Sequence, residues 1–333
     1  MTHQQRFFLG IDAGGTKTHA VIADQTGRIY GAGRAGAGNW ESAGLSGAGR
    51  VYAQALAGAL AMAGLAVDAL SGAGYGLSGV DWPSDTQRLR PVLRRLGVPG
   101  PHVLVNDAIV ALRAGSDEGY GIATIAGTGC TVVGRNRVGE QFRTLALGNE
   151  WGDFGAASDV VRLATRAIAF AHLGRGPETR LSERFAEAYG ADSVLDLVER
   201  ITRRKADRPG GRLAPLVFAT AADGDEVARA VLIAAGRELG QNAVAVARRL
   251  GLLAEPFDLV MAGGLFRASC PLFREALIEA VRACAPLVRA APLQAAPAIG
   301  GVLLAMDVCG EPAGAEVRHR LIEQARQHPI LFE

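Results

Sequence analysis

The chain has little cysteine and almost no net charge. Its four cysteines, Cys130, Cys270, Cys284 and Cys309, are scattered and form no C-x-x-C pair, which argues against a zinc site and against a disulfide framework. A reduced, cytoplasmic protein is therefore expected. The formal net charge of +2 gives no overall attraction to nucleic acid or to a membrane surface, so we expect neither as a partner.

Long apolar runs are missing as well. Charges or glycines interrupt every hydrophobic stretch, so no membrane-spanning helix is expected. The opening MTHQQR lacks the cationic start of a signal peptide. The apolar segment after it is too short for the hydrophobic region of a signal peptide and contains Asp12, so no signal peptide is expected. The basic runs RPVLRRLG and ITRRKADRPGGR are typical of solvated helix faces and loops.

What the chain does have is enough apolar residues for a large core. The hydrophobic fraction is 49% and the charged fraction is 20% of 333 residues. A single core rarely grows beyond about 250–300 residues, so two domains are expected. A strand, a glycine turn and a second strand occur twice, in FLGIDAGGTKTHAVIAD and in YGIATIAGTGCTVVGR, and this repeat predicts two related α/β domains.

The first of these turns, in GIDAGGTKT, is not a P-loop. That motif needs G-x-x-x-x-G-K-[ST] ahead of a helix, whereas here Gly15 is followed by Thr16 and Lys17 comes one position late. The residues after the turn, THAVIADQTG, are apolar and β-branched, which predicts a strand rather than a helix. Asp12 is therefore predicted at the end of a strand that enters a tight glycine turn.

The patterns along the chain also predict where the domains begin and end. Strands and helices alternate up to residue 115, and AGSDEGYG is predicted to join the two domains. The N-terminal domain is expected to span residues 1–115 and to be completed by C-terminal helices at 298–333. The second domain is expected to span residues 116–297, with a long helical stretch in its middle and a buried strand in PFDLVMAGGLF.

Three glycine-rich turns follow apolar strands, at Asp12–Thr16, Gly127–Gly129 and Gly263–Gly264. Glycine lets a ligand approach the backbone N–H groups of such turns closely. With these turns the chain resembles the actin, sugar-kinase and heat-shock-chaperone superfamily, and within it the N-acetylglucosamine kinase and BadF/BadG-type ATPase family. The matching motifs are GIDAGGTKT for phosphate 1, IAGTGCTVVG for phosphate 2, LVMAGGLF for adenosine and VLVNDAIVAL for the catalytic strand end.

The resemblance implies two actin-like, ribonuclease H-like domains with ATP in a cleft between them. Phosphate binding is expected from Gly14, Gly15, Thr16, Lys17, Gly127, Thr128 and Gly129, and adenosine binding from Gly263, Gly264 and Phe266. Asp12 is expected to hold Mg²⁺ through water, because Mg²⁺ keeps several waters and takes few carboxylates. Two alternatives stay open, namely that Asp12 is a turn or cap residue and that strand alternation points Lys17 outward.

Asp107 is the residue that the resemblance places as general base. A sugar hydroxyl loses its proton as it attacks the γ-phosphate, and a carboxylate within hydrogen-bond reach can accept that proton. Asp107 follows a strand and opens a helix, so helix capping is the alternative role, which neighbouring Asn106 can also perform.

The sugar itself is expected beside Asn39, Trp40 and Asp153 as well as Asp107. An amide offers directed hydrogen bonds to hydroxyls, and an indole offers a flat apolar face to the sugar ring. Core packing is the alternative role for Trp40, and a helix N-cap is the alternative for Asp153.

The chain departs from the family pattern in three places. The Glu of the family's G-D-E-G is Phe154, the usual G-G-W-G is replaced by LALGN at residues 145–149, and the phosphate-2 Ser is Cys130. Backbone contacts to phosphate should survive these changes, whereas contacts to the sugar are altered. The expected activity is an ATP-dependent amino-sugar kinase, and glucosamine, N-acetylglucosamine and an N-acetylmuramic relative all stay open as its substrate.

Two other functions stay open. BadF-type relatives are ATPases that activate another enzyme and hold an iron–sulfur cluster through cysteine thiolates, but this chain has no closely spaced cysteine pair between its phosphate motifs. The other is a non-catalytic protein, either an actin-like assembly or a sugar-binding regulator. A regulator of the related repressor type would carry a helix-turn-helix ahead of the first strand, where only MTHQQR stands. A homodimer is expected from the resemblance alone.

Overall fold

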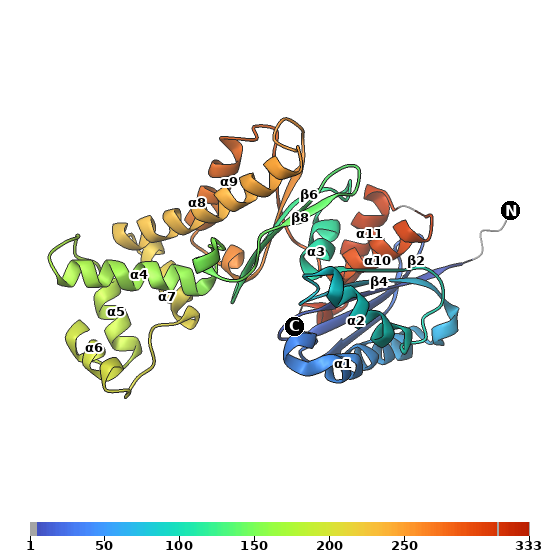
Figure 1. The fold of residues 1–333 in the computed structure, drawn as a ribbon, viewed down its shortest axis with the longest axis horizontal. Helices are drawn as coiled ribbons and strands as arrows, with labels where there is room; N and C mark the ends of the chain where they lie inside the picture. The colour runs from blue at the N-terminus through green and yellow to red at the C-terminus, as the bar shows by residue number, and fades with distance from the viewer. Residues whose placement is uncertain (1–4, 312, 333) are drawn as a thin grey trace. The chain divides into compact units, whose positions relative to one another are not determined.

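The computed structural model describes residues 5–311 and 313–332. These residues form two compact units. Unit 1 contains the described residues up to Ala123 together with those from Ala291 onward, and unit 2 contains Thr124–Ala290. Each unit is built on a five-stranded sheet with helices, so the α/β class and the two actin-like domains are as predicted (Figure 1). The cleft between the domains stays a prediction.

The sheet of unit 1 has the strand order β3-β2-β1-β4-β5. Its strands are β1 (Phe7–Ala13), β2 (Thr18–Asp24), β3 (Ile29–Ala35), β4 (Leu70–Leu77) and β5 (His102–Asn106). β1 pairs antiparallel with β2 and parallel with β4, and β4 pairs parallel with β5. The carboxyl ends of β1, β4 and β5 therefore lie at one edge of the sheet, which is where open α/β sheets bind their ligands.

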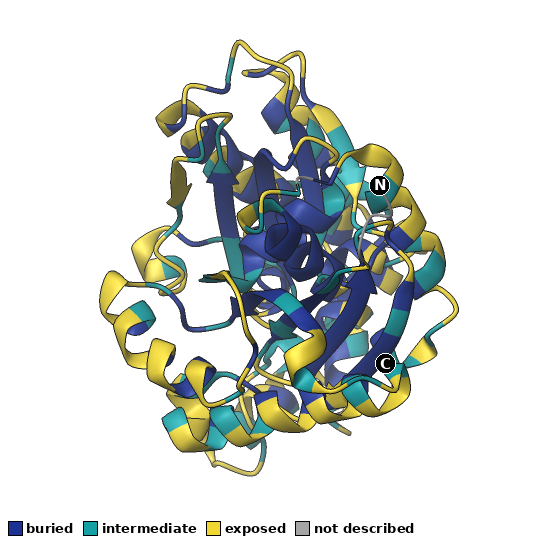
Figure 2. Ribbon diagram, turned by 90° about the vertical axis from the view of Figure 1, so that its right-hand side faces the viewer, coloured by how far each residue is buried: buried dark blue, intermediate teal, exposed yellow. Residues whose placement is uncertain are grey.

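Helices cover both faces of this sheet. They are α1 (Trp40–Ala63), η1 (Val67–Ala69), α2 (Pro83–Arg94), α3 (Asp107–Gly115), α10 (Ala298–Val308), α11 (Ala315–Ala325) and η5 (Pro329–Leu331). α1 and α2 share a core with the side chains of Leu9 and Ile11, whereas α10 and α11 share one with Phe8 and Val21. Figure 2 shows the buried residues concentrated in the strands and in the central helices.

Glycines let α10 lie directly on the backbone of the sheet. A Cβ atom at Gly10 of β1 would stand 2.2 Å from the carbonyl oxygen of Ala298. A Cβ atom at Gly74 of β4 would stand 2.1 Å from the carbonyl oxygen of Gly301. Both distances are far below van der Waals contact, so any side chain at these positions would push the helix off the sheet.

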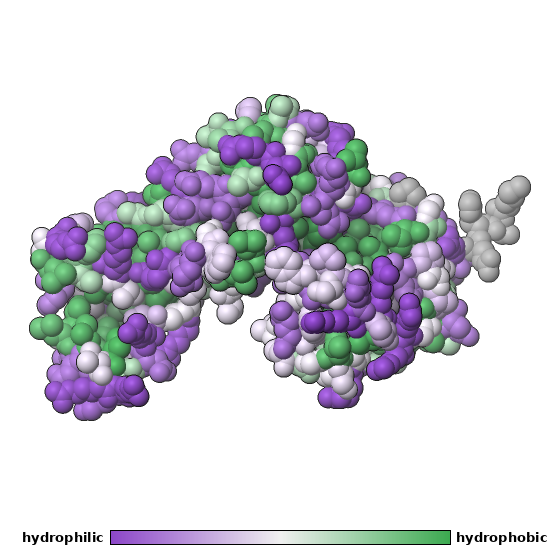
Figure 3. All heavy atoms as spheres, in the orientation of Figure 1, coloured by the Kyte–Doolittle hydropathy of each residue, from purple (hydrophilic) through white to green (hydrophobic). Residues whose placement is uncertain are grey.

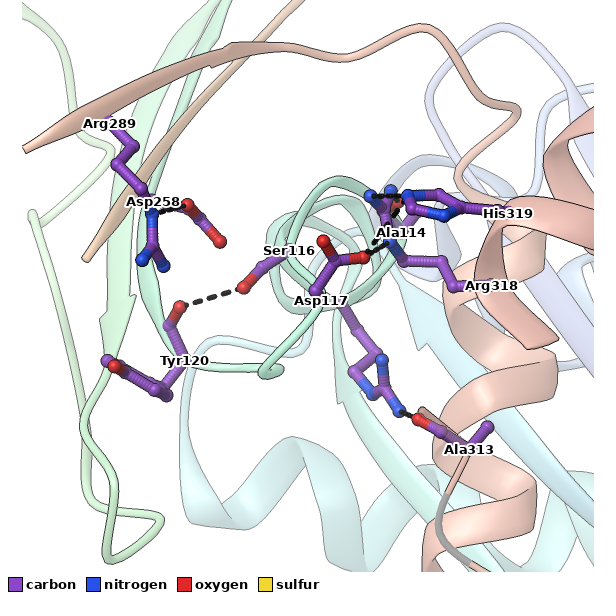
Figure 4. Close-up of polar contacts among 10 residues, drawn as sticks. Ala114, Ser116, Asp117, Tyr120, Asp258, Arg289, Ala313, Arg318 and His319 are labelled. Atoms are coloured by element: carbon purple, nitrogen blue, oxygen red, sulfur yellow. Dashed lines mark hydrogen bonds and ion pairs between the residues drawn. The ribbon is translucent and has the colours of Figure 1, made fainter. Parts of the chain in front are cut away.

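Two arginines fasten the C-terminal helices to the end of α3. The Nε atom of Arg113 donates to Asp307 Oδ2 at 3.0 Å, and the side chain of Arg113 is 5% exposed. Arg318 of α11 donates to Asp117 Oδ1 at 2.6 Å and to the carbonyl oxygen of Ala114 at 2.8 Å, as Figure 4 shows. The chain after residue 290 is thus an integral part of unit 1.

Unit 2 carries the second sheet, with the strand order β10-β9-β6-β7-β8. Its strands are β6 (Gly121–Ala126), β7 (Cys130–Arg135), β8 (Gln141–Arg143), β9 (Asp258–Ala262) and β10 (Arg289–Pro292). Its helices are η2 (Asn149–Trp151), α4 (Ala157–His172), α5 (Leu181–Ala188), α6 (Val194–Thr202), η3 (Gly211–Leu213), α7 (Ala214–Ala222), α8 (Glu226–Arg249), η4 (Gly264–Arg267) and α9 (Leu272–Arg282). The strand–turn–strand repeat predicted from the sequence is present as β1–β2 and β6–β7.

The structure differs from the predicted elements in two places. β10 was not predicted, because its four residues include Pro292 and no β-branched residue, which is what strand prediction depends on. α1 begins earlier than its Ala-rich pattern indicates, because the Asn39 side chain caps it and Gly44 bends it with a φ of 69°.

The surface of both units mixes polar and apolar residues on the face drawn in Figure 3. Among the described residues, none of the helices combines the length and the apolar character needed to cross a membrane.

Candidate active site

The carboxyl ends of β1, β4 and β5 bring two carboxylates into one site. Asp12 stands near the end of β1, and Asp107 follows β5 as the first residue of α3. Ser78 joins these strand ends, because its amide donates to the carbonyl oxygen of Ala13 at 2.8 Å and its hydroxyl donates to the Asp107 carboxylate. Ser78 was missed in the sequence, where only its place directly after a buried strand marks it.

Burial and a neighbouring negative charge raise the pKa of both carboxylates. Burial, and then the negative charge of Asp107, raise the pKa of Asp12 to about 8, although the positive charge of Lys17 opposes the rise. Burial, and then the negative charge of Asp81, raise the pKa of Asp107 to about 6, while backbone amides and Ser78 hold it down. Two acids with such raised pKa values at one sheet edge are typical of a functional site.

Asn106 fixes the geometry around Asp107. Its side-chain oxygen accepts from the amide of Ala108 at 3.0 Å, so Asn106 is the N-cap of α3. Its Nδ2 atom donates to Asp81 Oδ1 at 3.1 Å. Asn106 therefore caps the helix, while the carboxylate of Asp107 is held by backbone amides at the start of α3 and by the hydroxyl of Ser78.

The turn between β1 and β2 presents its tip to solvent. Gly14 closes the turn by donating its amide to the carbonyl oxygen of Lys17 at 2.9 Å. Gly15 and Thr16 at the tip are exposed, and a Cβ atom at Gly15 would meet nothing within 4 Å. Lys17 acts electrostatically on Asp12, so its charge is felt inside the site.

Asn39 and Trp40 lie beside the loop that follows β4. The Asn39 side chain accepts from the amide of Glu41 at 2.8 Å, which caps α1. The indole Nε1 of Trp40 donates to the carbonyl oxygen of Gly79 at 2.7 Å, next to Ser78. Both residues are only partly buried and therefore keep part of their surface for a ligand.

In unit 2, the two predicted nucleotide turns are neighbours. A Cβ atom at Gly127, in the turn between β6 and β7, would stand 3.8 Å from the amide nitrogen of Gly264 after β9. Gly263 has a φ of 107°, and a Cβ atom there would stand 2.1 Å from the carbonyl oxygen of Ala126. Only glycine fits this close approach. The predicted phosphate-2 and adenosine residues are thus brought together within one unit.

Thr128 and Gly129 are exposed at the tip of the β6–β7 turn. Phe266 is different, because the residue is only 9% exposed and its ring centroid lies 5.5 Å from that of Phe273 in the core. The side chain of Phe266 is therefore part of the core of unit 2. Cys130 begins β7, and burial, together with the charges of Asp159 and Asp153, raises the pKa of its thiol to about 12.

Asp153 is buried and holds the loop that precedes it. It is 3% exposed, and its Oδ2 atom accepts from the amide of Leu147 at 2.8 Å. The alternative role of helix N-cap is wrong, because Asp159 accepts from the amides of Gly155 and Ala156 at the start of α4. Phe154, which replaces the family's Glu, instead packs under the guanidinium of Arg162.

No group of three or more His, Cys, Asp or Glu side chains arranged to hold a metal ion is found within residues 5–311 and 313–332. A single carboxylate such as Asp12 does suit Mg²⁺, which takes one or two carboxylates and fills its other positions with water and phosphate oxygens.

The sequence model of the BadF/BadG/BcrA/BcrD ATPase family matches residues 9–305. The chain belongs to this family. The resemblance predicted from the turn motifs is thereby confirmed. Membership implies use of ATP.

Two curated relatives of the chain are sugar kinases. The N-acetylmuramic acid/N-acetylglucosamine kinase of Clostridium acetobutylicum is 28% identical over 305 residues, which cover 91% of this chain and 99% of the relative. The N-acetyl-D-glucosamine kinase of Dictyostelium discoideum is 29% identical over 78% of this chain and 85% of its own length. A crystal structure from Chromobacterium violaceum, provisionally assigned as an N-acetylglucosamine kinase, is 26% identical, has a TM-score of 0.64 and matches 90% of this chain and 98% of its own.

Proposed function

We propose that this family member is an ATP-dependent kinase that phosphorylates a hydroxyl of an amino sugar of the N-acetylglucosamine or N-acetylmuramic acid type. The observation that carries the proposal is Asp107, a carboxylate with a raised pKa at the carboxyl edge of the sheet, beside the turn of Asp12–Thr16. The two curated relatives that share most of the chain's length and are named as such kinases support the substrate class.

Asp107 is the general base of this proposal. Its carboxylate accepts the proton of the attacking sugar hydroxyl while the sugar oxygen bonds to the γ-phosphorus and the bond from that phosphorus to the ADP oxygen breaks. A pKa of about 6 suits the task, because the carboxylate is ionised at neutral pH and still basic enough to take a proton. Ser78 orients the carboxylate by donating its hydroxyl hydrogen.

Each of the two turns is proposed as a phosphate-binding turn. In unit 1 the exposed tip residues Gly15 and Thr16 offer amides and a hydroxyl to phosphate, and in unit 2 Thr128 and Gly129 offer the same groups. Adenosine is proposed to lie against Gly263 and Gly264. Mg²⁺, held by Asp12, would neutralise charge on the phosphates when bound.

The sugar is proposed to lie beside Asn39 and Trp40, near the Gly79 loop. Asp153 is proposed as a further sugar-binding residue, because it stands at the Asp of the family's G-D-E-G segment. A soluble, cytoplasmic homodimer completes the proposal by analogy with the family.

The activator-type ATPase is the weaker candidate. An iron–sulfur cluster needs cysteine thiolates, and burial keeps the thiol of Cys130 protonated by raising its pKa to about 12. The other three cysteines lie far along the sequence, from Cys270 onward.

ADP release from Mg·ATP tests the proposal. The protein is assayed with glucosamine, N-acetylglucosamine, N-acetylmuramic acid and glucose, beside Asp107→Asn and a matched Asp68→Asn control at an exposed position in η1. We expect one amino sugar to stimulate release, Asp107→Asn to lower kcat about 10²–10⁴-fold, and Asp68→Asn to behave as wild type. Release that no sugar stimulates, or full activity in Asp107→Asn, would refute the proposal.

A further inference from the structure

Three polar residues form a row across the sheet of unit 1. Asp12 of β1 pairs in register with His19 of β2, and His19 pairs in register with Arg34 of β3. Residues paired directly across antiparallel strands place their side chains on the same face, with Cβ atoms about 4.5–5.5 Å apart. His19 therefore stands between the carboxylate of Asp12 and the guanidinium of Arg34.

The face that carries this row is the one that α10 covers. Gly10, two residues before Asp12, faces the backbone of α10 at Ala298. Val21, two residues after His19, belongs to the core formed with α10 and α11. Because side chains alternate along a strand, Asp12 and His19 point to this same side.

His19 is buried with one ring nitrogen unused. The residue is 2% exposed, and its Nε2 atom has no hydrogen-bond partner in the part of the chain that the structure describes. The ring bonds to the backbone carbonyl of Ile330 in η5, which leaves Nδ1 as the donor and Nε2 as a free acceptor. Burial lowers the pKa of His19 to about 4.

A purely structural role for His19 explains the bond of one ring nitrogen but not the burial of the other. The bond to Ile330 accounts for Nδ1, since it ties the C-terminal turn to β2. A buried acceptor without a donor costs about 1–3 kcal/mol, so an apolar ring would pack at lower cost unless Nε2 has a partner in the working protein. Of the two residues that pair with His19 across the sheet, Asp12 is the one whose carboxylate can bind water and cations.

We propose that His19 is a positioning residue for Asp12, whose Nε2 accepts a hydrogen bond from a water molecule shared with the Asp12 carboxylate. This water belongs to the hydration shell of the cation that accompanies ATP. His19 thereby orients the Asp12 carboxylate toward the cation. It takes no part in binding the phosphates, which is the role proposed for the turn between β1 and β2. The inference rests on the proposed function, since it takes Asp12 as the group that holds Mg²⁺.

The experiment measures how ATP binding depends on Mg²⁺. Binding of ATP to the full chain is followed by calorimetry, first in EDTA and then over a series of Mg²⁺ concentrations. The variants are His19→Phe, which keeps a ring but removes both nitrogens, and His19→Gln, which keeps an acceptor. His102→Phe is the matched control, because His102 lies at the amino end of β5, away from the carboxyl edge.

We expect His19→Phe to raise the Mg²⁺ concentration for half-maximal binding about tenfold or more, as outer-shell partners of metal ligands do. ATP affinity in EDTA should be unchanged, His19→Gln should recover most of the Mg²⁺ response, and His102→Phe should match the wild type. Unchanged Mg²⁺ dependence in both His19 variants would overturn the inference and leave the kinase intact. Equal weakening with and without Mg²⁺ would show a purely structural role and would overturn it too.

A wild-type protein that binds no ATP under any condition would overturn the kinase proposal and this inference together. Phosphorylation of an amino sugar by a His19→Phe variant with wild-type Mg²⁺ response would overturn the inference alone.

Discussion

The charge of Asp81 should set the acid limb of the pH–activity profile. Asp81 raises the pKa of Asp107, and it accepts a hydrogen bond from Asn106 at 3.1 Å. In Asp81→Asn the side-chain oxygen that accepts this bond remains, while the negative charge is lost. The pKa of Asp107 should therefore fall, and the general base should stay ionised at lower pH.

The fall expected in the pKa of Asp107 is only part of the total rise, because Asp81 is not the main cause of that rise. The pKa of Asp107 rises from 3.8 to about 6, with burial as the largest cause and Asp81 as a smaller one. Removing Asp81's charge should therefore lower the pKa by about 0.5–1 unit. At pH 5 the ionised fraction of Asp107 would grow from about 10% to about 25–50%, a roughly threefold to fivefold gain in kcat/KM. At pH 8 the ionised fraction is already complete, so no gain is expected there.

The assay is kcat/KM for sugar phosphorylation from pH 4.5 to 8.5, measured with an ADP-coupled readout. Asp68→Asn, an exposed carboxylate in η1, serves as the control for loss of one negative charge. The reasoning fails if the acid limb of Asp81→Asn stays in place, if it moves to higher pH, or if the control moves it equally.

Three further substitutions test the fold and the ATP turns. Gly263→Ala forces a side chain into a φ of 107° and against the carbonyl oxygen of Ala126, so melting should show a loss of about 1–3 kcal/mol and ATP binding should weaken; an unchanged Tm would contradict the close approach. Arg113→Ala leaves the Asp307 carboxylate without its partner, so denaturant unfolding should show a loss of about 3 kcal/mol, and a neutral effect would contradict the ion pair's role. Thr16→Val keeps the shape but removes the hydroxyl, so KM for ATP should rise about tenfold, and an unchanged KM would remove Thr16 from the phosphate contacts.

The strands and turns were open to prediction because they are local. Apolar, β-branched runs that end in glycine mark β1, β2, β6, β7 and β9, and the turn motifs between them locate Asp12 and Gly263. β10 lacked such a pattern, since it is a short strand of small residues that exists only because it pairs with β9.

The side-chain partners were much harder to predict, because they depend on which strand lies beside which. Ser78 matters because β4 lies between β1 and β5, and only the sheet order reveals its bond to Asp107. The pairing of Asp12 with His19 follows from the length of the turn between β1 and β2, so it could have been predicted from the sequence. The bond of His19 to Ile330 was not, because it joins positions at opposite ends of the chain.

The glycine contact between α10 and the sheet has a consequence for synthesis of the chain. Unit 1 takes its strands from the first part of the chain and α10 from the last, whereas the whole of unit 2, Thr124–Ala290, is made in between. At about 5–20 residues per second, the ribosome needs roughly 10–30 s to add that segment. During this time the bare face around Gly10 and Gly74 has no helix to cover it, so unit 2 can finish folding before α10 covers that face of the first-made strands.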